Sequence, residues 1–493
     1  MPISRREFLK LSALVTTSAA LSGCGPIFRG LAGSMSVTDW SPMNAHDFTV
    51  LNRLTFGARP DERARFLEVG LKPWIEEQLD IQSIDDLDCS LRLAPFRSLE
   101  MEANELEAIS NQLFENYDRE SLPAELRLAS LIRQVYSRRQ LYEVMVGFWN
   151  DHLNIFTEKG NCFYLKTVDD RRVVRTHALG SFRELILASA HSPAMLVYLD
   201  NHVNHKGAPN ENYARELMEL HTLGVNGGYS QADVMELARC LTGWTVKDHF
   251  WLGDFEFNAD LHDPGVKYVL GMEISNSGIN EAEKVIDTLS THPSTARFIS
   301  SKLAWRFIAD DPPEELIQKG ARAFLDTEGD IKSVLRVILL DGVDFVQPKY
   351  KRPSDFVISA LRMLHAQTDG RGPDESLRGM GQSLFGCPTP DGYPDNSAAW
   401  QGNLMPRWNF AFRLVRGEIE GTQIDMEHLL AYVPDDDLTV RFDALATLLL
   451  GVPIAEPFRS GLMELITSGG TNEEEMLQIL AAGILVSPSF QWK

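Results

Sequence analysis

The spacing of apolar residues constrains the fold more than any other feature of this sequence. Between Glu125 and Trp149, apolar side chains recur three or four positions apart, which places them on one face of an α-helix. Stripes with the same spacing run over residues 181–199, 230–244, 280–289, 294–308, 314–324 and 355–365. Strands do not alternate with these segments, which argues against a doubly wound sheet. The pattern predicts a mainly α fold, a multi-helical single large domain.

Two segments break the helical pattern. An alternating run over residues 255–258 and an apolar run over 266–270 flank a turn at 261–265, and together they predict a small β-hairpin. Residues 370–402 contain too many glycines and prolines for a helix and predict a long irregular loop. Long loops inside compact domains are more often functional than idle.

Composition narrows the class of protein. The chain has 493 residues, of which 44% are hydrophobic and 24% charged, so it can bury a sizeable core. Its net charge of −22 argues against a surface that binds nucleic acid. No run of about 18 apolar residues follows the N-terminal region, which excludes a polytopic membrane protein.

The first 24 residues have the pattern of an export leader. Residues 4–10 read Ser-Arg-Arg-Glu-Phe-Leu-Lys, a twin-arginine pattern, and the apolar stretch 11–21 is too short and too polar to span a bilayer. Residues 21–24 read Leu-Ser-Gly-Cys and are similar to a lipobox, in which cleavage precedes the cysteine and its thiol is acylated. The alternative is an ordinary amphipathic N-terminal helix.

The leader predicts the domain organisation and the location. Residues 1–23 form the signal peptide, 24–44 a tether and 45–493 the helical domain. We expect the twin-arginine translocase and the lipoprotein processing machinery as partners. The product is then a periplasmic protein of the cell envelope, membrane-anchored only through the lipid on Cys24. Gly25 follows Cys24 in place of the aspartate that would signal retention in the inner membrane, so anchoring in the outer membrane is left open.

Several standard motifs are missing. No Cys-x-x-Cys pair occurs, so zinc-ribbon, thioredoxin-like and c-type haem sites lack support. Buried free thiols are favoured over disulfides for Cys89, Cys162, Cys240 and Cys387. Neither Gly-x-Ser-x-Gly nor His-Glu-x-x-His is present, and Cys387-Pro388 stands where a phosphate-binding loop needs Lys-Ser/Thr.

The first candidate site is a polar helix face near residue 216. At 100° per residue, Asn212, Arg215, Glu216 and Glu219 share an arc about 100° wide, so the two glutamates converge as an acid/base pair or as metal ligands. The alternative is a solvated face of ion pairs between Arg215 and the glutamates one turn away. His221 falls on the opposite, apolar face and is expected to be a core histidine.

The second candidate site is the predicted hairpin turn, with His262, Asp263 and Lys267. Turns project side chains into clefts, where a His-Asp pair can ligate a metal or exchange protons. The alternative is a turn in which Asp263 only accepts backbone hydrogen bonds. A further histidine, His152, ends the segment 148–152, where helix capping is the simpler explanation.

The sequence resembles the bacterial family called domain of unknown function 1800, from about residue 45 to the end. The segments that carry the resemblance are Leu51-Asn52-Arg53-Leu54-Thr55-Phe56-Gly57, Phe148-Trp149-x-x-His152, Met195-x-x-Tyr198-Leu199-Asp200-Asn201, Asn210-Glu211-Asn212-Tyr213-Ala214-Arg215-Glu216, Leu241-Thr242-Gly243-Trp244, His262-Asp263-x-Gly265-x-Lys267, Asp391-Gly392-Tyr393-Pro394 and Ser487-Pro488-x-Phe490-Gln491. One departure is that Asn150 and Asp151 stand where the family pattern carries a second histidine and an asparagine.

The resemblance implies little chemistry, because the family has no established activity. It implies that members are often exported. It also implies that they are often encoded beside a second exported family, which resembles alkaline phosphatases and sulfatases.

Two hypotheses of different class follow. The first is a metal-dependent hydrolase of the envelope. Glu216, Glu219, His262 and His152 would hold a divalent metal ion that activates water. Glu216 and Glu219 would otherwise act as an acid/base pair beside Asp263, with Lys267 and Arg215 orienting an anionic group.

The second hypothesis is a non-catalytic binding or assembly protein. Its partner would be an exported phosphatase/sulfatase-like protein or an envelope glycan. The loop 370–402, with Tyr393 and Trp400, would then form an exposed contact surface. A redox or cofactor-carrying role is a third, smaller alternative.

Overall fold

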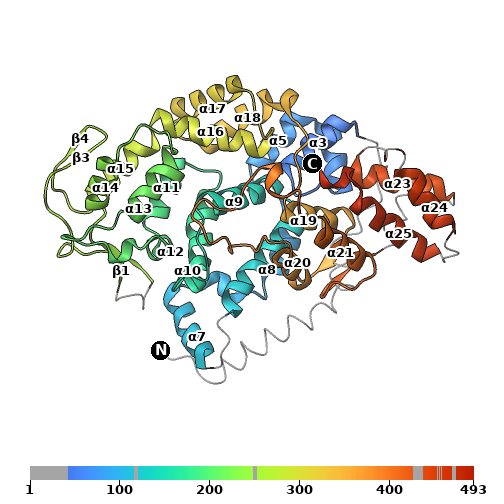
Figure 1. The fold of residues 1–493 in the computed structure, drawn as a ribbon, viewed down its shortest axis with the longest axis horizontal. Helices are drawn as coiled ribbons and strands as arrows, with labels where there is room; N and C mark the ends of the chain where they lie inside the picture. Colours follow the sequence, from blue (N-terminus) through green and yellow to red (C-terminus); the bar gives the residue numbers. More distant parts are fainter. Residues whose placement is uncertain are drawn as a thin grey trace.

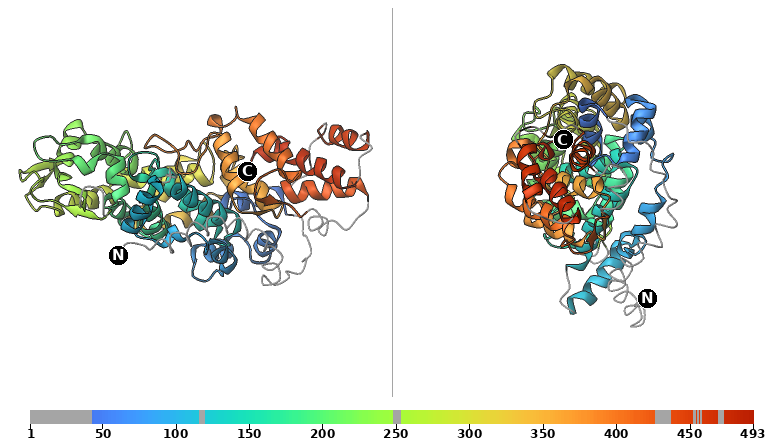
Figure 2. Two further views of the ribbon diagram at one scale, coloured as in Figure 1. Left: turned by 90° about the horizontal axis from the view of Figure 1, so that it is seen from below. Right: turned by 90° about the vertical axis from the view of Figure 1, so that its right-hand side faces the viewer.

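The computed structural model describes residues 43–115, 120–247, 253–425, 437–451, 454, 456, 458–468 and 473–493. The expected twin-arginine segment, the lipobox with Cys24 and the tether up to residue 42 lie outside the described residues. The fold is mainly helical, as the apolar spacing predicted. Figures 1 and 2 show an elongated body, with strands β1, β3 and β4 toward one end and the C-terminal helices at the other.

Helix α9 of the N-terminal half packs against α3, α5 and α8. In chain order, the helices of this half are α3 (Ala45–Leu54), α4 (Pro60–Val69), α5 (Leu71–Leu79), α6 (Leu87–Leu93), α7 (Ala103–Glu115), α8 (Ser121–Tyr136), α9 (Gln140–His152), α10 (Cys162–Asp169), α11 (Phe182–Ala190), α12 (Pro193–Tyr198), α13 (Glu211–Glu216) and α14 (Gln231–Cys240). The apolar stripe 125–149 therefore belongs to two helices, and the stripe 181–199 is divided before Pro193. Periodicity alone does not reveal such breaks, because both helices of a pair keep the same spacing.

The C-terminal half continues with α15 (Asn280–Ser290), α16 (Pro293–Phe307), α17 (Glu314–Asp326), α18 (Ile331–Asp341), α19 (Pro353–Met363), α20 (Arg371–Gly379), α21 (Leu404–Val415), α23 (Leu438–Leu450), α24 (Phe458–Ser468) and α25 (Glu473–Val486). Helix α16 begins with Pro293, whose fixed φ suits the first turn, and the side chain of His292 caps Ser294 N. Among the described residues, every helix is too short or too polar to cross a membrane.

Three small antiparallel pairs make up the β-structure of the described residues. Strands β1 (Trp244–Val246) and β2 (Phe255–Phe257) form one pair, and β3 (Lys267–Val269) and β4 (Met272–Ile274) form the second. The third joins β5 (Gln367–Thr368) to β6 (Thr422–Gln423).

The pairing predicted for the hairpin is wrong. Strand β2 does not pair with β3 across the turn 261–265 but with the preceding β1. Strand β3 turns back instead at Leu270-Gly271, where both residues have positive φ. A two-residue turn of this kind matches the right-handed twist of the two strands, so it fixes the register of β3 against β4.

The segment 370–402 is only partly a loop. Its first nine residues after Gly370 form helix α20, and Ser397–Ala399 form a 3₁₀ turn. The irregular part is therefore 380–396. The four cysteines Cys89, Cys162, Cys240 and Cys387 are buried and unpaired, as predicted.

Candidate functional site: a polar pocket between α9, α16 and residues 391–396

A cavity of about 320 Å³ lies where the C-terminal end of α9 meets α16 and the segment 391–396. We call it the Lys302 pocket. Its wall consists of Phe148, Asp151, His152, Lys302, Trp305, Arg306, Asp310, Arg352, Asp391, Tyr393, Pro394, Asp395 and Asn396. Most of these side chains are charged or polar, although α9 is otherwise buried along most of its length.

Helix α9 fixes His152 in one tautomer. Trp149, one turn earlier, is fully buried and donates its indole N–H to the carbonyl of Ala178, which anchors the end of the helix. Nε2 of His152 lies 3.0 Å from the carbonyl oxygen of His221. Since a carbonyl only accepts, Nε2 carries the proton and Nδ1 presents its lone pair. That lone pair accepts from Nζ of Lys302 at 2.9 Å.

Lys302 is a cation without a nearby anion. The ring of Phe298 lies 5.5 Å from Nζ, and no carboxylate of the described residues lies within ion-pair distance of it. Burial lowers the pKa of Lys302 to about 8, although Asp151, Asp395 and Asp391 act in the opposite direction from farther away. Burial, with the charge of Lys302, also holds the pKa of His152 well below its usual value, so the imidazole is neutral.

Arg306 lies one turn beyond Lys302 on α16, and both side chains reach the same pocket. Its side chain is 2% exposed. Nη2 donates to Asp355 at 3.4 Å, and Nη1 lies 3.6 Å from Asp395 without a hydrogen bond. Nε has no hydrogen-bond partner among the described residues. Two nitrogens of this buried guanidinium therefore have no hydrogen-bond acceptor among the described residues.

The floor of the pocket is a buried ionic network centred on Asp355. Arg306, Arg352 and Lys493 all lie within ion-pair distance of its carboxylate. Burial opposes ionisation, but these three cations hold the pKa of Asp355 well below its usual value. Arg352 in turn donates to Asp151 at 2.6 Å. The network connects the start of α19 to the end of α9.

The segment 391–396 is held over the pocket by backbone contacts. Gly392 has φ +72°, and a Cβ built there would lie 2.1 Å from the carbonyl oxygen of Asp151. Trp400 donates its indole N–H to Pro394, and Tyr393 donates its hydroxyl to Ser383. Asp391 remains exposed at the rim.

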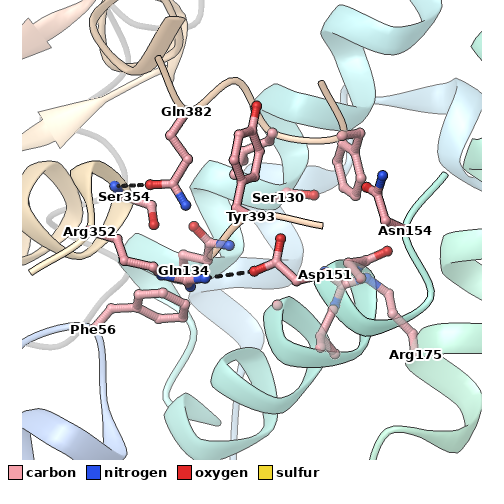
Figure 3. Close-up of a pocket in the computed structure, with 15 residues that line it drawn as sticks. Phe56, Ser130, Gln134, Asp151, Asn154, Arg175, Arg352, Ser354, Gln382 and Tyr393 are labelled. Carbon is pink, nitrogen blue, oxygen red and sulfur yellow. Dashed lines mark hydrogen bonds and ion pairs between the residues drawn. The ribbon is translucent and has the colours of Figure 1, made fainter. Parts of the chain in front are cut away.

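A smaller cavity of about 40 Å³ adjoins the pocket and shares Asp151, Arg352 and Tyr393 with it. Figure 3 shows Arg352 and Asp151 pointing toward each other across this cavity, with Tyr393 beside them. Gln382 accepts from the backbone N–H of Ser354 at its edge. The ion pair thus separates a narrow inner space from the larger pocket.

The predicted glutamate face is close to this pocket but does not line it. After burial, Glu219 is the largest cause that raises the pKa of Glu216, and Asp391 at the pocket rim adds to it. Tyr229 donates to Glu219 at 3.2 Å. The two glutamates are therefore near each other.

The helical geometry at this face differs from the regular helix that we assumed. A π-helical turn, η5 (Leu217–Thr222), follows α13, with the amide of Leu223 donating to Met218 five residues back. The turn is wider than an α-helical one, so from Leu217 onward the side-chain directions no longer follow the 100° per residue that we assumed. His221 is buried as expected, but its Nε2 makes no hydrogen bond. Arg215 pairs with Glu211, which is one of the two ion pairs of that alternative, and it also donates to Gln231.

His262, Asp263 and Lys267 form a separate cluster. His262 lies 2.8 Å from the carbonyl of Thr242 through Nδ1 and 3.1 Å from Glu281 through Nε2. Lys267 is fully buried and donates to Glu281 and to the carbonyl of Asp263. These contacts tie β3 to α15 and do not bring His262 to His152.

Asp263 has the turn role given as the alternative. Its Oδ1 accepts from the amide of Gly265 at 2.8 Å. Hydrogen bonds from Arg239 lower the pKa of Asp263 to about 2. The carboxylate of Asp263 thus stabilises the turn and joins it to Arg239 of α14.

The residues expected to hold a metal ion are not gathered at one point. Within the described part of the chain, no three His, Cys, Asp or Glu side chains meet as a metal ion requires. His152 and His262 also have both ring nitrogens engaged. As placed, these side chains do not fit a shared metal ion, and we derive no step through one.

The aromatic residues of the segment 380–400 do not form the contact surface that the binding hypothesis expected. Trp400 is 8% exposed, and Tyr393 is half-buried in the pocket wall. The exposed aromatic residue at the pocket is instead Trp305, which is 42% exposed.

Sequence reasoning missed Lys302 and Arg306. A signal for them exists in the stripe 294–308, where both fall beside the buried positions Ile299, Leu303 and Phe307. Charged residues on a helix face that is otherwise buried are uncommon and indicate a polar site.

The comparisons with known proteins agree with the resemblance seen in the sequence. The model of the family described as "Protein of unknown function (DUF1800)" matches residues 49–492. Neither the curated proteins nor the solved structures gave a match.

Proposed function

The chain belongs to the DUF1800 family, and on that premise we propose that it is a hydrolase whose proton-transfer group is Lys302. The single observation that carries the proposal is the 2.9 Å contact between Lys302 and the neutral imidazole of His152, in the wall of a 320 Å³ pocket. A buried amine in a concave polar site is typical of a catalytic acid or base.

The pKa of Lys302 suits this role. With a pKa of about 8, the amine exists in both protonation states near neutral pH. The ammonium form can donate a proton to the leaving group and regain one from the attacking water. His152 acts as a positioning residue, because its Nδ1 accepts from Lys302 and its Nε2 is held by His221.

Carboxylates complete the site. Asp391 at the rim and Asp395 in the wall are acceptors for the hydroxyl groups of a substrate or for the attacking water. Hydrolysis is the reaction class that needs water alone as the second reactant, and an open pocket with an exposed rim admits it. The proposal uses no metal ion.

The location is proposed from the leader, together with the export and lipid-processing machinery as partners. Residues 4–10 and 21–24 support export through the twin-arginine translocase and a lipid anchor on Cys24. A periplasmic enzyme of this kind would act on compounds of the cell envelope. A phosphatase/sulfatase-like partner remains part of this proposal through the family resemblance.

The test compares the wild type with Lys302→Met, which keeps the side-chain length and removes the amine. Each is incubated with p-nitrophenyl esters, phosphates, sulfates and glycosides, and with a bacterial envelope extract analysed by mass spectrometry. We expect a product from the wild type and a rate roughly 10²- to 10⁴-fold lower in the variant.

Lys332→Met is the matched control, because it removes the same charge from α18 and does not line the pocket. It should keep the wild-type rate. A Lys302→Met variant as active as the wild type contradicts the proposal, and so does a wild type that forms no product in either assay.

A further inference from the structure

Resting on the proposed function, we infer that the substrate of this pocket carries one anionic oxygen group, a phosphate, sulfate or carboxylate, bound between Lys302 and Arg306.

Lys302 is partly buried and has no carboxylate partner among the described residues. Its three N–H groups have one hydrogen-bond acceptor among the described residues, the neutral imidazole of His152. A cation taken out of water without a counter-charge is costly, and a bound anion removes that cost. Two of the three donors are free for a ligand.

Arg306 supplies the second half of the anion site. Its Nε and Nη1 have no hydrogen-bond partner among the described residues, although the side chain is only 2% exposed. Nε and Nη1 lie on different edges of the guanidinium, so each of them can donate singly to an oxygen of a carboxylate, phosphate or sulfate. Because Lys302 and Arg306 are four residues apart on α16, their side chains project from the same helix face.

The other cations at the pocket are already matched by carboxylates. Arg352 donates to Asp151 at 2.6 Å. Lys349, beneath the pocket, lies 3.3 Å from Asp310 and 3.2 Å from Asp395. Arg306 is also within ion-pair distance of Asp355 and Asp395. Among the described residues, Lys302 is therefore the cation of the pocket wall that has no carboxylate partner.

The acidic groups limit the ligand to a single anionic group. Asp391, Asp395, Asp310 and Asp151 all line the same cavity. Nearby cations, foremost Lys349, hold the pKa of Asp395 far below its usual range, so it remains charged. A second anionic group would face these carboxylates, whereas hydroxyl groups would donate to them.

The size of the cavity and the exposed ring of Trp305 restrict the rest of the ligand. A cavity of 320 Å³ is at the low end for small-molecule sites. Trp305 also lines it and is 42% exposed. The ring offers a flat apolar face to one ring of a ligand. The ligand class is thus a small hydroxylated or cyclic compound with one anionic group.

The test measures anion binding to the full chain by thermal unfolding. Phosphate, sulfate and acetate are titrated separately, with chloride keeping the ionic strength constant. We expect the unfolding midpoint of the wild type to rise saturably with at least one of the three ions. The ion that binds tells a tetrahedral head group from a carboxylate.

Three variants locate the binding. Lys302→Met should weaken the dissociation constant at least tenfold, Lys302→Arg should retain binding, and Lys332→Met should match the wild type. The same saturable shift in the wild type and Lys302→Met would overturn the inference. So would a wild type that responds to none of the three ions.

The two proposals fail in different ways. If an ion binds through Lys302 but Lys302→Met keeps its turnover, the anion site stands and the hydrolase assignment is wrong. If Lys302→Met abolishes turnover but no ion binds, the assignment stands and the anion site is wrong.

Discussion

Nζ of Lys302 lies 2.9 Å from Nδ1 of His152, although 150 positions separate the two residues. The contact joins the middle of α16 to the last residue of α9. It is possible only because His152 gives its proton-bearing nitrogen to the carbonyl of His221 and its lone pair to the lysine. A histidine that looked like a helix cap in the sequence is therefore part of a pocket.

The same substitution should change the stability of the protein very differently at Lys302 and at Lys267. Lys302→Met removes a cation with no carboxylate partner, so the free energy of unfolding should change by less than about 1 kcal/mol. Lys267→Met leaves the fully buried Glu281 without its ammonium partner and should cost roughly 3–5 kcal/mol. Urea unfolding of both variants measures the difference, and equal losses would contradict the roles given to the two lysines.

Asp355 should be the acidic residue on which the pocket floor depends. Asp355→Asn leaves Arg306, Arg352 and Lys493 without their shared anion and should cost roughly 3–5 kcal/mol at pH 7. Its folded pKa lies below the unfolded value, so its contribution is present above about pH 4 and is lost as the pH falls further.

The control for Asp355→Asn is an exposed ion pair. Glu314→Gln breaks the contact with Arg297, in which both side chains are half exposed, and should cost far less stability than Asp355→Asn. If the two variants lose the same stability, the buried network does not have the role described.

The fold class was predictable and the site only in part. Helices follow from apolar spacing, which Ile299, Leu303 and Phe307 illustrate on α16. The same spacing does not show that Lys302 on this helix meets His152, because that contact depends on how distant helices pack. The strand pairing was predicted wrongly because residues 261–265 are richer in turn-forming residue types than Leu270-Gly271, where the chain turns back.

The glutamate face illustrates a different limit. Its residues were correctly placed near one another, since Glu219 acts on the pKa of Glu216. The π-helical turn from Leu217 could not be read from the residue types, because such turns arise from tertiary packing and have little sequence signature. The metal-ion hypothesis grouped His262 with these glutamates, but His262 contacts Thr242 and Glu281 instead.

His221 should make the protein less stable in mild acid. Burial lowers its pKa to about 3, whereas the unfolded chain binds a proton near pH 6.5. Between these values the unfolded state holds one more proton, so the free energy of unfolding falls by about 1.4 kcal/mol per pH unit on acidification. His221→Leu should reduce the slope of stability against pH by one proton. Urea unfolding at pH 6.5, 5.5 and 4.5 measures it, and an unchanged slope would show that His221 titrates normally.

Gly392 should be required for the loop that covers the pocket. Gly392→Ala places a Cβ against the carbonyl of Asp151, in addition to the strain of positive φ. Gly381→Ala carries the same φ strain, at +79°, but meets nothing within 4 Å. We expect Gly381→Ala to bind anions as the wild type does and Gly392→Ala to bind them at least tenfold more weakly. Equal binding by the two variants would mean that the loop does not shape the pocket.

The measurement that tests the central claim most directly is the ionisation of Lys302 in the intact chain. Competitive labelling with acetic anhydride across pH 6–11, read for each lysine by peptide mass spectrometry, reports the pKa of the amine. The account predicts a midpoint near 8 for Lys302. A midpoint near 10.5, that of an ordinary lysine, would contradict a proton-transfer role for this residue.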